Sequence, residues 1–367
     1  MIKVLFDHQT FSLQRYGGIS RYFANVYHTI QKQDDIQAKI SALYTNNYYL
    51  KDFNGLLSNN PVGKLIFKER VRGYLWNRAY SKRVIDKNDF DIFHPTYYHT
   101  YFLERLKKPF VLTVHDMIHE IMPEYFPNDD KSSFEKRQCI EKASHIIAIS
   151  ENTKRDLQNI FQIPDEKITV IHHGFTPSQE SDETGAETDI SKGNYLLFVG
   201  DRSFYKNFYR FAIAAAAFLQ KRKDFKLICA GGGPFQHAEI EHLLKLKIMD
   251  RVTQITATER ELDLLYQNTS AFIFPSIYEG FGLPILEAFK QKAPIIMSDI
   301  ACFREIAGDA SLYFNPFDPE DILAKIEHLV DDKALKDDLI KKGSQQILNF
   351  TMEKCANKTI DVYRNLL

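Results

Sequence analysis

The sequence has few of the features that would mark a secreted, metal-bound or membrane-spanning protein. Only four of its 367 residues are cysteine, and none of them forms a Cys-x-x-Cys pair. This scarcity argues against a disulfide framework or a zinc site and favours a reducing, cytoplasmic location. No run of about 18 apolar residues is present that could span a bilayer. The opening residues, Met1–Asp7, predict a β-strand rather than a signal peptide.

The pattern of charges and glycines argues against further classes of protein. The formal net charge is −1, so no overall positive field indicates a nucleic-acid partner. No Gly-x-Gly-x-x-Gly segment follows the first predicted strand, which argues against a dinucleotide-dependent dehydrogenase. An acidic pair, Asp89 and Asp91, precedes a predicted strand instead of following one, so we interpret it as surface charge. We expect neither a metal ion nor a cofactor.

Short apolar runs alternate with helical patterns along the chain, which predicts doubly wound α/β domains. The predicted strands are Val4–Asp7, Ala38–Tyr44, Ile92–His94, Phe110–His115, Ile146–Ile149, Ile168–Ile171, Tyr195–Val199, Lys226–Ala230, Ala271–Phe274 and Ile295–Met297. The predicted helices include Ser20–Ile30, Asn152–Phe161, Phe208–Lys221, Glu259–Gln267, Pro284–Lys290 and Pro319–Ile347.

One segment interrupts this alternation and divides the chain. Residues 176–192 contain five acids, one lysine and no aromatic residue, with frequent Ser, Thr and Gly, which is typical of a linker. We therefore predict an N-terminal domain over residues 1–175 and a C-terminal domain over 193–349. Residues 350–367 read as a final amphipathic helix with Met352, Ala356, Ile360 and Tyr363 on one face.

The most informative segment is Glu279-Gly-Phe-Gly-Leu-Pro-Ile-Leu-Glu287. It lies between the predicted strand Ala271–Phe274 and a helix that starts at Pro284, a residue suited to the first helical turn. A glycine-rich turn before a helix lets backbone N–H groups approach an anion, and the helix dipole favours negative charge there. Carboxylates on either side are better suited to accept hydrogen bonds from hydroxyls. Phosphate flanked by two polyols describes a nucleotide-sugar, although an ordinary turn with two surface glutamates is the alternative.

This segment resembles the E-x7-E motif of retaining glycosyltransferases of family 4, group 1, which have the GT-B fold. The resemblance implies two Rossmann-like doubly wound domains facing across a cleft, with the C-terminal helix crossing back to the N-terminal domain. It implies a catalytic role for Glu279 on the sugar hydroxyls and a ribose contact for Glu287. The resemblance also implies that four further residues of this segment bind the donor: Gly280, Phe281, Gly282 and Leu283.

A second segment, Gly200-Asp-Arg-Ser-Phe-Tyr-Lys-Asn207, follows the strand Tyr195–Val199. Ligands bind at the carboxyl ends of strands in open α/β sheets, where Arg202 and Lys206 could neutralise a leaving diphosphate. Asp201 departs from the family's pattern, in which Arg follows Gly directly, and solvated loop charges are the alternative reading. After the next strand, the resemblance places Gly231 beside the nucleotide.

In the N-terminal domain, Gly17 and Gly18 precede a predicted helix, and the resemblance places them opposite the donor phosphates. A flexible turn before a capped helix is the alternative. His115 ends the predicted strand Phe110–His115, and the resemblance places it near the transferred sugar, although a lone histidine is often structural.

A basic segment with aromatic residues, Lys64–Arg83, could contact anionic lipid at the inner membrane surface. Its apolar residues spread around the helical wheel, so a basic helix packed on the core is the other reading.

Taken together, these residues predict a metal-independent retaining hexosyltransferase that uses a nucleotide-sugar donor. Val199–Asn207 resembles mannosyltransferase-like members that build bacterial surface polysaccharides, which favours GDP-mannose over UDP-sugars and dTDP-rhamnose. The acceptor would be a glycan or a lipid-linked glycan. A GT-B epimerase that acts on nucleotide-sugars, or a catalytically silent GT-B protein that binds a glycan or a partner enzyme, are the alternatives.

Overall fold

The computed structural model describes residues 1–58, 60, 61, 63, 70–175, 193–202 and 204–367. The chain forms two compact units, Met1–Gly174 together with Thr351–Leu367, and Phe175–Phe350. The predicted linker, residues 176–192, and residues 64–69 of the basic segment lie outside the described residues. Among the described helices, none is long and apolar enough to cross a membrane.

In the described residues of the first unit, six parallel strands form two three-stranded sheets, ordered β2-β1-β3 and β4-β5-β6. A parallel bridge between Phe93 and Phe110 joins β3 to the start of β4. The strands are β1 (Ile2–Phe6), β2 (Ile36–Ile40), β3 (Ile92–His94), β4 (Val111–Val114), β5 (His145–Ala148) and β6 (Ile168–Val170). The α-helices are α1 (Gln9–Leu13), α2 (Gly18–Ile30), α4 (Arg70–Lys87), α5 (Ile118–Ile121), α6 (Ser132–Lys142) and α7 (Glu151–Phe161).

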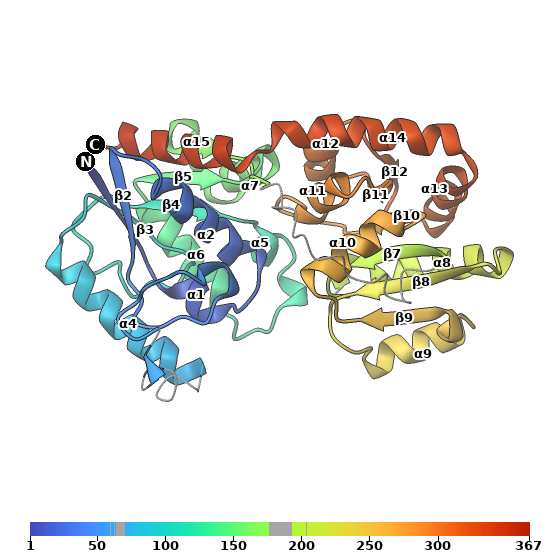
Figure 1. The fold of residues 1–367 in the computed structure, drawn as a ribbon, viewed down its shortest axis with the longest axis horizontal. Coiled ribbons are helices and arrows are strands. Elements are labelled where there is room, and N and C mark those ends of the chain that lie inside the picture. Colours follow the sequence, from blue (N-terminus) through green and yellow to red (C-terminus); the bar gives the residue numbers. More distant parts are fainter. Residues whose placement is uncertain (59, 62, 64–69, 176–192, 203) are drawn as a thin grey trace. The chain divides into compact units, whose positions relative to one another are not determined.

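The last helix of the chain, α15 (Met352–Asn365), belongs to this first unit, where it packs on α2 (Figure 1). The side chain of Thr351 caps it by accepting a hydrogen bond from the Lys354 N–H. The apolar face predicted from the sequence is buried in the core beside β1 and α2. The Tyr363 hydroxyl lies 2.7 Å from Nδ1 of His94, which ties the helix to β3. The return of the C-terminal helix to the N-terminal domain is therefore confirmed.

The described residues of the second unit contain a six-stranded parallel sheet in the order β12-β11-β10-β7-β8-β9. Its strands are β7 (Asn194–Val199), β8 (Phe225–Ala230), β9 (Val252–Ile255), β10 (Ala271–Phe274), β11 (Ile295–Ser298) and β12 (Leu312–Phe314). Its α-helices are α8 (Phe208–Lys221), α9 (His237–Lys245), α10 (Glu259–Asn268), α11 (Leu283–Lys290), α12 (Ala301–Ala307), α13 (Pro319–Asp331) and α14 (Lys333–Gln346).

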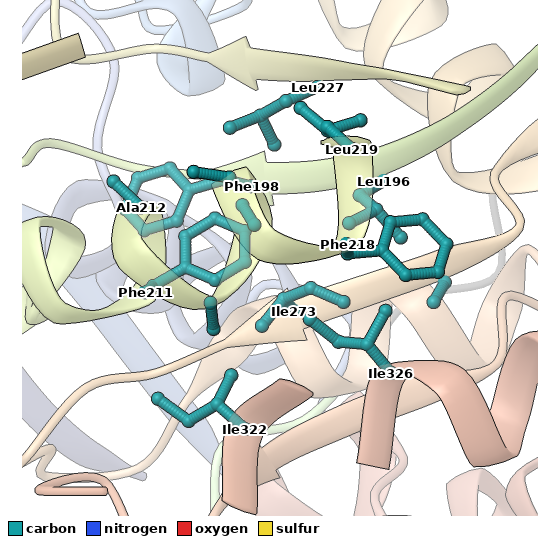
Figure 2. Packing of buried hydrophobic residues seen from close by; sticks show 14 of the residues in the cluster. Leu196, Phe198, Phe211, Ala212, Phe218, Leu219, Leu227, Ile273, Ile322 and Ile326 are labelled. Carbon is teal, nitrogen blue, oxygen red and sulfur yellow. The ribbon is translucent and has the colours of Figure 1, made fainter. Parts of the chain in front are cut away.

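The core of this unit lies between α8, α13 and the middle of the sheet. The alanine-rich run of α8 has high helix propensity, and its small side chains let α13 approach closely. Figure 2 shows Phe211 and Phe218 of α8 beside Ile273 of β10, with Ile322 and Ile326 of α13 directed at the same layer. The strands form unbroken apolar runs in the sequence because helices cover both faces of a parallel sheet.

The parallel α/β architecture predicted from the sequence is confirmed, with three local corrections. The strand predicted over Ala38–Tyr44 is β2, which ends at Ile40. The strands β9 and β12 were not predicted, because both are short and lie at the edges of the sheet. The single helix predicted over Pro319–Ile347 is interrupted at Asp332, which has a non-helical backbone. Its side chain accepts a hydrogen bond from the Leu335 N–H, so it starts α14 as a new helix.

Candidate functional site

The glycine-rich turn after β10 leads into the N-terminus of α11 at the carboxyl edge of the sheet in the second unit. Gly282 is the N-cap and has a φ of +94°, a left-handed conformation that favours glycine. A Cβ at this position would lie 3.0 Å from Ile285 and 3.2 Å from Phe303, so the turn also lacks room for a side chain. Pro at the second helical position suits an N-terminus whose first N–H groups have no partner within the helix.

Glu279 lies in this turn and is held by residues from two segments. Its Oε1 accepts hydrogen bonds from Nζ of Lys206 at 2.6 Å and from Oγ of Ser276 at 2.7 Å. Lys206 ends a short 3-10 helix after β7, so the ion pair joins the carboxyl ends of two adjacent strands. Both side chains are mostly buried, with exposed fractions of 16% for Lys206 and 14% for Glu279. A carboxylate and an ammonium therefore meet where a ligand would bind in such a sheet.

The ammonium of Lys206 keeps its charge in this environment. Burial alone lowers the pKa of Lys206, but the carboxylate of Glu279 outweighs that effect, with smaller contributions from Tyr205 and Asp201. The pKa of Lys206 is therefore raised above its ordinary value. An ammonium has three N–H donors, so Lys206 can bind an anion while it remains bonded to Glu279.

Glu287 lies one turn into α11, and its surroundings differ from those of Glu279. The hydroxyl of Tyr266, which is fully buried on α10, lies 3.4 Å from Oε2 of Glu287 and donates to it. Burial raises the pKa of Tyr266 well above its ordinary value, with the charge of Glu287 adding to the effect. Tyr266 therefore remains a neutral donor that orients the carboxylate.

Arg202 has a different environment from the one that its sequence position suggested. It is only 5% exposed, and its Nε donates to Oε1 of Glu239 at 2.8 Å. Its two terminal nitrogens donate to the backbone carbonyls of residues 231–234, at distances from 2.8 to 3.3 Å. These contacts hold the guanidinium within the protein, and direct contact of Arg202 with a diphosphate stays a prediction. Its guanidinium also holds the glycine turn after β8 in place.

That glycine turn has a backbone that few other residues could adopt. Gly231, Gly232 and Gly233 have φ angles of +92°, +68° and +69°. A Cβ on Gly232 would lie 2.6 Å from Nη1 of Arg202, so the turn packs directly on the guanidinium. Gly231 is thus placed beside the turn that follows β7, at the same edge of the sheet as Lys206.

In the first unit, His115 follows β4 and is buried among aromatic rings. It stacks on His173 with ring centroids 5.7 Å apart, and Tyr22 of α2 packs edge-on against both rings. Its Nε2 is buried and has no hydrogen-bond partner among the residues that the structure describes. Burial lowers the pKa of His115 to about 3, with His94 and Lys136 adding to the effect. The ring is therefore neutral at ordinary pH and suits a hydrogen-bonding role better than that of a charged acid.

Gly17 and Gly18 form the start of α2, at the same end of this unit as His115. The hydroxyl of Ser20 donates to the Gly17 carbonyl, and the Ser20 N–H donates to the side chain of Gln14. A Cβ on Gly17 would lie 2.4 Å from Oε1 of Gln14, so a side chain at this position would displace the amide of Gln14. Tyr22, one turn further along α2, connects these glycines to the histidine pair.

The structure therefore groups the predicted site residues by unit. In the second unit, Lys206, Glu279 and the start of α11 form one cluster, with Glu287 further along the helix. Sequence reasoning did not identify Ser276, Tyr266 or Glu239. Ser276 lies only three residues before Glu279, but no local pattern indicated the other two residues.

The acidic pair near β3 is surface charge, as interpreted from the sequence. Asp89 forms an ion pair with Lys3, and Asp91 accepts a hydrogen bond from the Lys3 N–H. Within the described part of the chain, no group of three or more His, Cys, Asp or Glu side chains is arranged to hold a metal ion.

The sequence of each half of the chain matches a known glycosyltransferase family. Residues 180–346 match the family described as glycosyl transferases group 1, and residues 16–179 match glycosyltransferase family 4. The chain is 26% identical to O-antigen chain mannosyltransferase B of Escherichia coli over 293 residues, which cover 77% of this chain and 76% of that protein. It is 27% identical to the O-antigen chain mannosyltransferase RfbU of Salmonella typhimurium over 58% of this chain and 59% of that protein. The Anabaena protein Alr3699/HepE, solved in complex with UDP-glucose, is 15% identical with a TM-score of 0.72, and the alignment covers 100% of both chains.

Proposed function

This chain belongs to the group 1, family 4 glycosyltransferases of the GT-B fold, and on that premise we propose that it transfers a mannosyl residue from GDP-mannose. The acceptor is a glycan or lipid-linked glycan in surface polysaccharide biosynthesis, and the configuration at the anomeric carbon is retained. The observation that carries the proposal is the buried Lys206–Glu279 pair beside the N-terminus of α11. The O-antigen mannosyltransferases among the relatives support mannose as the sugar.

The proposed reaction exchanges one glycosidic bond for another on the same face of the sugar. The bond between the anomeric carbon and the diphosphate oxygen breaks, which gives an oxocarbenium-like centre. The acceptor hydroxyl oxygen bonds to that carbon, and its proton passes to an oxygen of the leaving diphosphate. The negative charge that grows on the diphosphate is the part of this step that the protein can stabilise best.

Each site residue has a role in this step. The Lys206 ammonium and the backbone N–H groups of residues 280–283 stabilise the leaving diphosphate without a metal ion. Glu279 accepts hydrogen bonds from the sugar hydroxyls with the oxygen that Lys206 and Ser276 do not occupy. Glu287 accepts hydrogen bonds from the ribose. In the first unit, Gly17 and Gly18 contribute backbone N–H groups to the donor phosphates, and His115 contributes a neutral hydrogen-bonding ring near the sugar.

A thermal-shift panel of GDP, UDP, dTDP and their sugars tests the donor. Ligand binding to the native state raises the melting temperature according to occupancy and affinity. We expect the largest shift with GDP and GDP-mannose, and the shift should disappear in Lys206→Ala. Proton NMR of the product measures the configuration at its anomeric carbon, which we expect to be the same as in the donor. A larger shift with UDP would change the donor assignment, whereas no shift with any nucleotide would overturn the proposal.

Glu287→Ala should weaken donor binding by roughly 10- to 100-fold. The expected loss corresponds to about 1.5–3 kcal/mol for hydrogen bonds to a charged group. Calorimetric titration of GDP measures the effect, and Glu353→Ala on the exposed surface of α15 is the control. Unchanged affinity and turnover in Glu287→Ala would contradict a ribose contact.

Arg202→Lys separates the positioning role of this residue from direct contact with the diphosphate. An ammonium cannot reproduce the planar fork that holds four carbonyls and Glu239, so the glycine turn should shift. We expect the donor KM to rise about tenfold while kcat at saturating donor changes less than about threefold. A fall in kcat of about 100-fold with an unchanged KM would instead mean that the guanidinium stabilises the transition state directly.

A further inference from the structure

Helix α4 of the first unit is labelled in Figure 1, and it buries several polar residues while it exposes large apolar ones. The side it turns to the protein carries Gly73, Asn77, Ser81 and Ile85, all of which are buried. Asn77 accepts hydrogen bonds from the backbone N–H groups of residues 43 and 44 and donates to Oγ of Ser12. The Ser81 hydroxyl lies 2.7 Å from those of Ser41 and Tyr101. Hydrogen bonds rather than apolar packing therefore hold much of this side of the helix.

The opposite side of α4 exposes large apolar side chains. Val71 is 74% exposed, Leu75 is 48% exposed and Trp76 is 55% exposed. Ala79 and Arg83 are exposed at the following turns, so these residues form one continuous face along the helix. We call Val71, Leu75, Trp76, Ala79 and Arg83 the outer face of α4. Among the described residues of this unit, the outer face is turned to solvent, and exposed apolar faces of this kind mark interaction sites.

Charge around the outer face is strongly positive. Helix α4 contains six Lys and Arg residues and one acid, Asp86. The carboxylate of Asp86 forms an ion pair with Arg105 at 2.9 Å, so its charge is locally compensated. Arg83 and Lys87 are exposed, and Lys82 is half-buried beside them. An occupant of this face would have to combine an apolar interior with a negatively charged surface.

We propose that the outer face of α4 docks on the surface of an anionic lipid bilayer. Val71 and Leu75 would enter the boundary between headgroups and acyl chains, where the amphipathic ring of Trp76 is also favoured. The basic residues would bind anionic headgroups. A protein partner fits less well, because lysine is depleted at protein interfaces, whereas Lys82 and Lys87 lie beside the outer face. The inference does not depend on the identity of the sugar donor.

Vesicle binding by the full chain tests this proposal directly. Trp76 is the only tryptophan, so its fluorescence reports on the outer face without labelling. We expect the protein to co-sediment with vesicles of phosphatidylcholine mixed with phosphatidylglycerol, with a blue shift of the Trp76 emission. Vesicles of phosphatidylcholine alone should bind at least about fivefold more weakly, and added salt should weaken binding to the anionic vesicles.

Two variants and one control make the test specific. Leu75→Glu should lower binding to the anionic vesicles by about tenfold or more, since it places a carboxylate on the outer face. Arg83→Glu should lower it by about fivefold or more. Leu244→Glu, at a leucine of similar exposure on α9 of the second unit, should bind like the unmodified chain. These sites are solvent-exposed, so we expect melting temperatures close to that of the parent chain.

Equal binding to both kinds of vesicle, or no effect of Leu75→Glu, would overturn the proposal. Self-association that Leu75→Glu abolishes, measured by sedimentation velocity in the absence of vesicle binding, would also overturn it and identify the face as an interface between copies.

Discussion

Replacing Lys206 with alanine is expected to lower turnover by about 100- to 1,000-fold, which is the usual effect of removing one donor to a developing negative charge. The ammonium lies 2.6 Å from Glu279, and its raised pKa keeps it protonated. Its removal also leaves the mostly buried Glu279 carboxylate with Ser276 as its described hydrogen-bond partner. Both the charge on the leaving group and the orientation of Glu279 should therefore be affected.

Steady-state kinetics with the donor identified in the thermal-shift panel would measure this effect. The matched control is Lys223→Ala, an exposed lysine just before β8, at the opposite edge of the sheet from Lys206. Turnover in the control should be unchanged. Lys206→Arg should recover part of the lost activity, because it restores a positive charge with a different shape. Turnover of Lys206→Ala within a few-fold of the parent chain would exclude a role for the ammonium in the chemical step.

The first unit should lose stability steeply as the pH falls below about 6.5. Four of its histidines, His8, His94, His115 and His173, are at most 7% exposed. Burial lowers the pKa of His8 to about 4 and those of His94 and His115 to about 3, and it lowers the pKa of His173 well below the ordinary value. In the unfolded chain these rings titrate near 6.5.

The sign of the effect follows from which state binds protons first. Between pH 6.5 and about 4, the unfolded chain binds protons that the folded unit does not, so acid favours unfolding. Well below pH 6.5, each such histidine lowers the free energy of unfolding by about 1.4 kcal/mol for each pH unit. The four together therefore approach about 5 kcal/mol per pH unit. That slope is comparable with the total stability of many domains, about 5–15 kcal/mol.

Urea unfolding at pH 7, 6 and 5, followed by circular dichroism and by the fluorescence of Trp76, measures this slope in the first unit. His94→Gln removes one titrating ring and should reduce the slope by about a quarter. His237→Gln, on an 89% exposed side chain of the second unit, is the control and should leave the slope unchanged. A free energy of unfolding that stays constant from pH 7 to pH 5 would contradict the prediction.

Most of the fold could be predicted because the parallel strands are buried on both faces and read as apolar runs. The strands Ile92–His94 and Ala271–Phe274 and the helix Phe208–Lys221 were predicted with the bounds that the structure has. The two missed strands show the limit of this signal. Residues 252–255 contain two polar side chains and are partly exposed, and residues 312–314 form a three-residue edge strand. Edge strands need less apolar surface, so their sequences carry a weaker pattern.

For the site, sequence patterns located the candidate segments but not the contacts between side chains. Lys206 and Glu279 are 73 residues apart, and their ion pair depends on β7 and β10 being neighbours in the sheet. The strand order is set by long-range packing, which no local spacing encodes. Arg202 illustrates the same limit, because its position after β7 suggested an anion contact, whereas its partner Glu239 directs it to the glycine turn.

The sequence by itself determined the α/β class, the division into two domains, the apolar face of the last helix and the glycine-rich turn before α11. Each of these depends on local periodicity, on backbone freedom or on helix capping, which neighbouring residues decide. Only the tertiary structure decided that Arg202 faces inward, that Tyr266 donates to Glu287 and that α4 exposes Val71, Leu75 and Trp76. Those outcomes depend on which buried polar groups find partners, and the partners come from distant parts of the chain.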